Sequence, residues 1–231
     1  MRQVRNKWFI LILVVPLLGP ECHAQIDELL PELDVYYKLN RNVRVSIQAK
    51  ETRESGTPTT AELGPSLDIY LLRMTKLVES TSFDLDDSKT RPLLLTVGYR
   101  YLPTPDQPPT NRMEPVLTAA LPVPKLKIVM TDRNRADLDW QNGNLSWRYR
   151  NRLQFERSVR IHSYHLSPFV STEVFYESRY GKWSDTAIYA GCIFRLGKHS
   201  EVNPYYEHQN ETGKSQNQQL NQLGLILSLY F

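Results

Sequence analysis

Cysteine is scarce in this chain of 231 residues: Cys22 and Cys192 are the two that it has. Cys22 falls within a segment that we expect to be cleaved off, so the mature chain would keep one cysteine and could form no intramolecular disulfide. The sequence also lacks CxxC pairs, cysteine–histidine clusters with the spacing of metal ligands, and a glycine-rich nucleotide loop. We therefore expect no metal site, no cofactor and no nucleotide chemistry.

Long hydrophobic runs are missing as well. The longest, Trp8–Leu18, has 11 residues. It is too short to cross a bilayer as a helix, because a span needs about 20 apolar residues. It follows the basic stretch 1–7 and precedes the small residue Ala24, as the hydrophobic region of a secretory signal does. The sequence predicts a signal peptide at 1–24 and a mature, exported domain at 25–231.

An excess of charge of one sign is absent too. The 28 basic and 25 acidic residues nearly balance. Removal of residues 1–24 takes away three basic residues and one acidic residue, which leaves a formal net charge of +1. Such a balance gives no basis for a nucleic-acid partner.

What the mature chain has instead is a two-residue alternation of apolar and polar side chains, clearest at its C-terminus. Although the mean hydropathy of the chain is −0.45, the chain ends on apolar residues at every second position, namely Leu223, Leu225, Leu227, Leu229 and Phe231. A period of two indicates a β-strand with one apolar face. This ending resembles the C-terminal signal by which barrel-assembly machinery recognises its clients, so we expect that machinery as a partner.

Five further stretches alternate in the same way, at 33–39, 43–50, 66–71, 93–101 and 145–156. A soluble β-sandwich, with the apolar faces buried, is one interpretation. The opposite faces carry Arg, Lys, Asp and Glu, which suits the wet lumen of a transmembrane barrel. Aromatic residues near the predicted strand ends suit an interfacial girdle, and they are Tyr99, Tyr101, Trp140, Trp147, Tyr176, Tyr205 and Tyr206. The pattern as a whole favours the barrel.

One hairpin can be predicted residue by residue. Asn142-Gly143 is a strong signal for a two-residue type I′ turn. If Gln141 pairs with Asn144, the numbers of paired residues sum to 285 along both strands. Apolar residues then face apolar residues, and the polar side pairs Asp137 with Arg148, Arg135 with Arg150 and Arg133 with Arg152.

The number of strands follows less directly from the sequence. About 11 can be counted, whereas bacterial single-chain barrels have even numbers. With the C-terminus at the periplasmic side, the outer loops would be 104–112, 142–143, 178–185 and 210–219. Met74–Thr90 would then be one long periplasmic connection, and because such connections are short we predict a weak strand near Lys76–Leu85. The expected fold is an all-β, antiparallel, up-and-down transmembrane barrel of about 12 strands, with 10 as the alternative.

The stretch Thr131–Glu156, TDRNRADLDWQNGNLSWRYRNRLQFE, resembles a bacterial outer-membrane family catalogued as domain of unknown function 2490. Members show an Arg-Asn-Arg strand, a turn and a Trp-Arg-Tyr-Arg-Asn-Arg strand, and this chain has both, at 133–135 and 147–152. PELDVYYKLNRNVRVSIQ at 31–48, VGYRYL at 97–102 and the terminal aromatic fit the same pattern, so the resemblance covers most of the mature chain. It implies an outer-membrane barrel and supplies no reaction or cargo.

With the apolar faces outward, the hairpin turns five arginines toward the lumen: Arg133, Arg135, Arg148, Arg150 and Arg152. The carboxylates near enough on the same strands to pair with them are Asp137, Asp139 and Glu156. Like charges opposite each other destabilise a sheet, so the arginines need anionic partners. In one interpretation the barrel is structural and salt-bridged, with partners across the lumen such as Asp68, Glu173, Glu177 or Glu207. In the other the partners are anionic solutes and the barrel is a narrow, porin-like pore.

An outer-membrane hydrolase acting on lipid is an alternative, because the sequence offers His162, Ser163, His165 and Ser167 in one short stretch. Face parity opposes it: His165 and Ser167 would face the lumen, and the other two would lie in a turn. A small receptor-like barrel is a further alternative, although the outer loops are too short for a dedicated binding domain. We therefore expect a non-enzymatic protein of the cell outer membrane, with membrane lipid and the assembly machinery as partners and anionic small solutes as candidate cargo.

Overall fold

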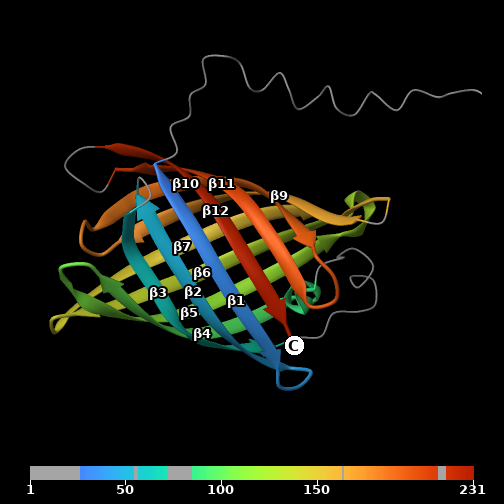
Figure 1. Cartoon of the computed structure of the whole chain (residues 1–231), viewed down its shortest axis with the longest axis horizontal. Helices are drawn as coiled ribbons and strands as arrows, with labels where there is room; N and C mark the ends of the chain where they lie inside the picture. The colour runs from blue at the N-terminus through green and yellow to red at the C-terminus, as the bar shows by residue number, and fades with distance from the viewer. Residues whose placement is uncertain (1–26, 55–56, 72–84, 163, 213–216) are drawn as a thin grey trace, which may run out of the picture.

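The chain forms a closed β-barrel in the computed structural model (Figure 1), which describes residues 27–54, 57–71, 85–162, 164–212 and 217–231. The predicted signal peptide lies outside these residues. The strands are β1 (Glu28–Lys38), β2 (Val43–Glu54), β3 (Thr57–Tyr70), β4 (Leu93–Thr104), β5 (Gln107–Val123), β6 (Ile128–Gln141), β7 (Asn144–Arg157), β8 (Val159–Ile161), β9 (Tyr164–Glu177), β10 (Lys182–Arg195), β11 (Ser200–Glu211) and β12 (Gln218–Tyr230). Two 3₁₀ helices, η2 (Asp87–Thr90) and η3 (Pro124–Leu126), lie in connections. None of the helices among the described residues is long and apolar enough to span a membrane.

Strand β8 continues β7 along the wall. Both pair with β9 in one unbroken register, from Arg148 opposite Glu177 to Ile161 opposite Tyr164. Ser158 interrupts the strand between them. With β7 and β8 taken together the wall has 11 strands, and the prediction of a β-barrel of about 12 strands is confirmed.

The first and last strands close the barrel in parallel. β1 pairs with β12 from Glu28 opposite Gln222 to Tyr36 opposite Tyr230, and the backbone N–H of Phe231 donates to the Tyr36 carbonyl at 2.9 Å. The other described strand pairs are antiparallel. An odd number of up-and-down strands forces one parallel seam, because the first and last strands then run in the same direction. The barrel differs from the expected antiparallel one at this seam.

The odd strand number also places the start of β1 and the end of β12 at opposite ends of the barrel (Figure 1). We call the end where β12 finishes the C-terminal rim, and the end where β1 begins the hairpin rim. The connections 39–42, 124–127 and 196–199 lie at the C-terminal rim. The turns 105–106, 142–143 and 178–181 lie at the hairpin rim.

Strands β3 and β4 are neighbours in the wall and pair directly, for example Ile69 with Leu95. The strand predicted near Lys76–Leu85 falls on residues 76–84, which lie outside the described residues, and on Leu85, which is a bend. The described end of the connection turns inward, since Asp86, Ser88 and Lys89 line the central cavity. We call Leu85–Thr90 the inserted segment.

Apolar side chains point outward and charged ones inward. On β7, Trp147 and Phe155 are each 43% exposed, whereas Glu156 is 3% exposed. On β12, Leu225 is 51% exposed and its neighbour Ile226 faces the cavity. A soluble β-sandwich buries its apolar faces, so this structure excludes that interpretation.

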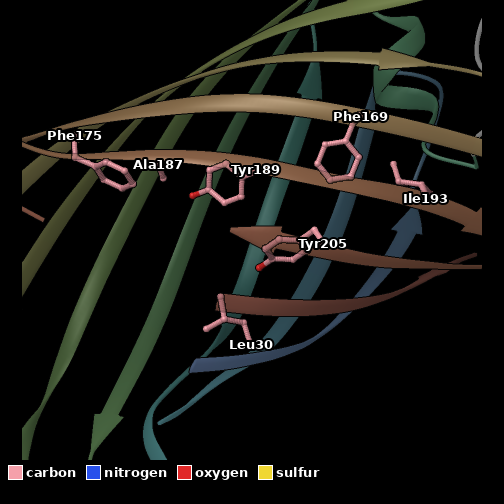
Figure 2. Packing of buried hydrophobic residues seen from close by; sticks show 7 residues of the cluster. All are labelled: Leu30, Phe169, Phe175, Ala187, Tyr189, Ile193 and Tyr205. Carbon is pink, nitrogen blue, oxygen red and sulfur yellow. The ribbon is translucent and has the colours of Figure 1, made fainter. Parts of the chain in front are cut away.

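One part of the interior is apolar, on the wall that runs from β9 through β10, β11 and β12 to β1. Its buried cluster, shown in Figure 2, consists of Leu30, Phe169, Phe175, Ala187, Tyr189, Ile193 and Tyr205. Tyr205 was predicted for the outer girdle, and this is wrong: it is 9% exposed and lies 6.1 Å from the Tyr189 ring inside the barrel. Other girdle residues do lie on the outer face, with Tyr99, Tyr101, Trp140 and Trp147 at 38–43% exposure.

Candidate functional site

The β6–β7 hairpin carries the five arginines in the predicted register. Asn142 and Gly143 have φ angles of 51° and 78°, the left-handed backbone that a type I′ turn requires. Gln141 pairs with Asn144, and the pairing continues without a shift along both strands. The predicted opposite pairs are therefore confirmed: Asp137–Arg148, Arg135–Arg150 and Arg133–Arg152.

Asp137 is the central carboxylate of this arginine cluster. Its side chain is fully buried, with 0% exposure. It accepts a hydrogen bond from Arg135 Nε, and its Oδ2 lies 2.9 Å from Arg148 Nη2. Arg150 Nη1 lies 3.9 Å from the same oxygen. One carboxylate thus neutralises arginines on both strands and reduces the repulsion between the opposed pair Arg135 and Arg150.

Strand β9 supplies a second carboxylate, Glu173, which the structural interpretation predicted as a partner. Arg150 binds it in a bidentate manner, with Nε 2.9 Å from Oε1 and Nη2 3.0 Å from Oε2. Arg152 Nη2 lies 2.7 Å from Oε2, and the Tyr189 hydroxyl donates to the same oxygen at 2.7 Å. Two arginines therefore share one carboxylate that is 2% exposed.

The remaining predicted carboxylates have different partners. Their ion pairs are Glu177 with Arg148 at 3.8 Å, Asp68 with Arg44 at 2.7 Å, and Asp139 with Arg112 at 2.6 Å. Glu207 lines the cavity from β11, and within the described ranges no ion pair joins it to an arginine. Sequence reasoning thus named the right residue types, but Asp68 and Asp139 pair with Arg44 and Arg112 instead of with the five hairpin arginines.

A further layer on β4 and β5 was missed. Glu114 is 3% exposed, accepts a hydrogen bond from Arg135 Nη2 and lies 3.6 Å from Arg100 Nε. Arg112 and Glu114 alternate with apolar residues on β5, and this alternation was the signal that could have placed them inside. The arginine cluster therefore extends across four adjacent strands, β4 to β7.

The inserted segment is anchored to three separate strands. Its contacts are Lys89 Nζ with Glu156 Oε2 on β7 at 2.7 Å, Asp86 Oδ1 with Arg44 Nη1 on β2 at 2.7 Å, and the backbone N–H of Leu85 with Glu201 on β11. Burial acts to raise the pKa of Asp86, but Arg44, Lys89 and the backbone N–H of Ser88 outweigh it and lower that pKa to about 2. These contacts hold the segment inside the lumen, and Glu156 forms its ion pair with this segment, at Lys89.

Arg133 differs from the other four arginines. Among the residues that the structure describes, no carboxylate forms an ion pair with it. Its side chain lines the cavity, and its neighbours across the two adjacent strands are Arg152 and Thr118. Within the described ranges, one guanidinium of the cluster therefore lacks an ion-pair partner and lines the cavity.

Aromatic rings of the buried cluster cover the guanidinium planes. Arg152 lies over the Tyr189 ring at 4.1 Å, and Arg150 over the Phe175 ring at 4.8 Å. Figure 2 shows both rings projecting from neighbouring strands β9 and β10. Stacking of this kind favours Arg over Lys, because the planar guanidinium is weakly hydrated. The remaining open space is a cavity of about 520 Å³, lined by charges of both signs.

The comparisons with known proteins agree with the hairpin motif. A family model described as a protein of unknown function (DUF2490) matches residues 89–220, which is more than half of the chain. The chain belongs to the DUF2490 family. The DUF2490 match begins at Lys89 in the inserted segment and ends in β12, so it contains the whole arginine hairpin and leaves β1 to β3 outside. The resemblance inferred from the sequence is confirmed. No curated protein matches the chain.

The hydrolase candidates of this DUF2490 chain are not gathered on one outer surface. Ser167 is 1% exposed on the inner side of β9, and His162 lies in a turn with φ of 57°. Ser163 lies outside the described residues, and His165 faces inward like Ser167. Within the described part of the chain, no three His, Cys, Asp or Glu side chains come close enough to hold a metal ion. The absence of catalysis stays a prediction.

The C-terminal residues of the DUF2490 chain form part of its outer face and of its seam. Leu223, Leu225 and Leu227 are 38–51% exposed, and Leu229 lies on the same face. Phe231 is 60% exposed and stacks on His199 at 5.9 Å. These residues therefore have a structural role in closing the barrel, and their role as an assembly signal stays a prediction.

Proposed function

We propose that this protein is a non-enzymatic outer-membrane β-barrel, exported by its N-terminal segment and inserted by barrel-assembly machinery that reads its C-terminal strand. The observation that carries the proposal is the distribution of side chains. Leu225, Trp147 and their neighbours form an apolar exterior, while carboxylates such as Asp137 and Glu173 are buried inside with their arginines. A closed wall with this polarity suits lipid, because an unpaired strand edge or an exposed charge would be energetically costly in the hydrocarbon region.

Within the membrane, we propose a closed structural barrel in preference to an open pore. Four of the five hairpin arginines are engaged by Asp137, Glu114, Glu173 or Glu177, and the aromatic cluster covers two of them. The inserted segment adds ties to β2, β7 and β11. Both features favour a lumen that its own side chains obstruct.

Conductance of the refolded mature chain in a planar bilayer tests this choice. Folded protein, identified by a gel shift between unboiled and boiled samples, should give no discrete current steps. The Asp86→Asn/Lys89→Gln variant removes two ties of the inserted segment and should conduct at least intermittently. Discrete anion-selective steps from the wild type, weakened in Arg148→Ala/Arg150→Ala, would mean that the barrel is an anion pore.

A second candidate function is the binding of anionic solutes in the lumen, and Arg133 favours it. Its guanidinium has no carboxylate partner among the described residues and borders the cavity, and Arg binds phosphate or carboxylate through two parallel hydrogen bonds. Inorganic phosphate should then raise the urea midpoint of the wild type but not of Arg133→Gln, since a ligand stabilises only the folded state that binds it. An equal effect of phosphate on both proteins, matched for ionic strength, would remove this candidate.

A further inference from the structure

A cluster of polar side chains interrupts the apolar exterior of the β6–β7 wall. It consists of Asp132 and Asn134 on β6 and of Tyr149 and Asn151 on β7, and we call it the outer polar cluster. Asn151 Nδ2 donates to Asp132 Oδ1 at 2.6 Å and to Asn134 Oδ1 at 3.1 Å, and the Tyr149 hydroxyl also donates to Asn134 Oδ1. Asn134 and Asn151 are the middle residues of the two Arg-Asn-Arg motifs, so their neighbours face the lumen while they face outward.

The cluster lies near the middle of the wall. Asn134 and Asn151 are directly opposed, seven residues from the turn at Gln141 and six from the start of β6 at Ile128. At about 3.4 Å per residue and the usual strand tilt, this depth is about 15 Å from either end of the hairpin. Given the membrane placement proposed above, on which this inference rests, that is the hydrocarbon region.

Apolar side chains surround the cluster on the outer face. Leu117 on β5 pairs with Asn134 and is 43% exposed, and Val174 on β9 pairs with Asn151. Along β7, Trp147 and Phe155 are each 43% exposed on either side of it. The cluster is therefore a polar island, and lipid tails could satisfy none of its hydrogen-bonding groups.

A second polar cluster on the outer face lies at a depth where polar groups can be solvated. Asn221 Oδ1 accepts from the Tyr206 hydroxyl at 2.7 Å and lies 3.0 Å from His208 Nδ1, and its backbone N–H donates to Asp27. These residues lie near the hairpin rim, where β1 begins and where headgroups and water would reach them. The outer polar cluster has no such access, so something else has to cover it.

In the part of the chain that the structure describes, the outer polar cluster has both donors and acceptors without partners, so its surface can pair with a second copy of itself. Within the described residues, the amide N–H donors of Asn134 have no acceptor, and Oδ2 of Asp132 has no donor. All of these side chains are partly exposed. A two-fold axis beside the cluster would bring donors of one copy to acceptors of the other, as an isologous contact requires. We propose that a second copy of this chain docks on the β6–β7 face through the outer polar cluster.

Disulfide trapping in lipid vesicles tests the dimer. In a Cys192→Ser background, Leu153→Cys places a thiol beside the cluster, on the residue opposite Asp132. The matched control, Ile47→Cys, places one on the outer face of β2, where Ile47 is 57% exposed. Mild oxidation at high lipid-to-protein ratio should cross-link the first protein to a dimer and leave the control monomeric.

The cluster itself is tested by removing its polar groups. Adding Asn134→Leu/Asn151→Leu to the Leu153→Cys protein should lower the cross-linked fraction by roughly tenfold, the effect of losing a few hydrogen bonds within a membrane. The isosteric Asp132→Asn should lower it by a smaller factor without altering the shape of the surface. Since leucine suits lipid, the double variant should still show the heat-dependent gel shift of a folded barrel.

Four outcomes would overturn the inference. Equal cross-linking of Leu153→Cys and Ile47→Cys, or cross-linking that the double variant leaves unchanged, would mean collisions without a specific interface. A folded, vesicle-inserted Leu153→Cys protein that stays monomeric would remove the dimer and leave the membrane barrel intact. A chain that does not insert into vesicles at all would remove both.

Discussion

Arg148 Nη2 donates to Asp137 Oδ2 at 2.9 Å, across a hairpin whose turn sets these two residues directly opposite each other. Asp137 is fully buried and also contacts Arg135 and Arg150. Asp137→Asn would leave three guanidiniums without this carboxylate, which should lower the free energy of unfolding by about 3–5 kcal/mol. Urea unfolding of the barrel in lipid vesicles, followed by tryptophan fluorescence, measures the loss.

The control for this prediction is Asp106→Asn. Asp106 lies in the exposed turn between β4 and β5 with φ of 57°, a conformation that Asn adopts as readily as Asp. Its replacement should change the stability by about 0.5 kcal/mol or less. If the two substitutions had the same small effect, the arginine cluster would not be a stabilising core.

The Tyr205 ring packs against the backbone of Gly224 on the next strand. A Cβ at Gly224 would lie 2.0 Å from Tyr205 Cζ, so Gly224→Ala must displace the ring. We expect the free energy of unfolding to fall by about 1–3 kcal/mol, as for other overpacked interiors. In a Tyr205→Leu background, Gly224→Ala should lower the free energy of unfolding by much less. Equal costs in the two backgrounds, measured by urea unfolding, would contradict a clash with the ring.

The ion pair of Asp86 with Arg44 predicts how the stability depends on pH. The pKa of Asp86 is lowered to about 2, so its carboxylate stabilises the folded state at every pH above its ordinary value of about 3.9. The stability difference between the wild type and Asp86→Asn should be constant, at about 2 kcal/mol, from pH 5 to 8. It should shrink as the pH falls from about 4 toward 2. A difference that instead shrinks above pH 5 would contradict this ion pair.

Arg133 and Arg150 should respond differently to the same substitution. Arg150→Gln leaves Glu173 with one arginine fewer and should lower the free energy of unfolding by about 1.5–3 kcal/mol. Arg133→Gln breaks no ion pair among the described residues and relieves the repulsion from Arg152, so it should be neutral or stabilise by about 0.2–1 kcal/mol. Urea midpoints of the two variants compare them directly, and a large loss for Arg133→Gln would mean that it has an anionic partner.

The β6–β7 hairpin could be predicted in full because its turn fixes the register. Asn142-Gly143 allows one two-residue geometry, and every pair then follows by counting. The polarity of each face follows from the same two-residue period. Tyr205 was misplaced although Glu201, Asn203 and Glu207 share its inner face, since its aromatic character was given more weight than its parity.

What the sequence could not provide are the contacts between elements distant in the chain. The parallel seam depends on an odd number of wall strands, and the alternation pattern before β4 does not fix that number. Likewise, the ion pair between Glu156 and Lys89 depends on the position of the inserted segment inside the barrel. Local rules fix which side of the wall a side chain faces, but its partner across the lumen is set by the closure of the barrel.

Tryptophan quenching by lipid tests the central claim most directly. In a background without the native tryptophans, Leu225→Trp and Ile226→Trp place one indole on each face of β12 at nearly equal depth. In vesicles made from lipids with brominated acyl chains, the indole introduced at Leu225 should be strongly quenched. The one at Ile226 should keep most of its fluorescence. Equal quenching of the two, or stronger quenching at Ile226, would contradict a barrel with its apolar face in lipid and its charged face inside.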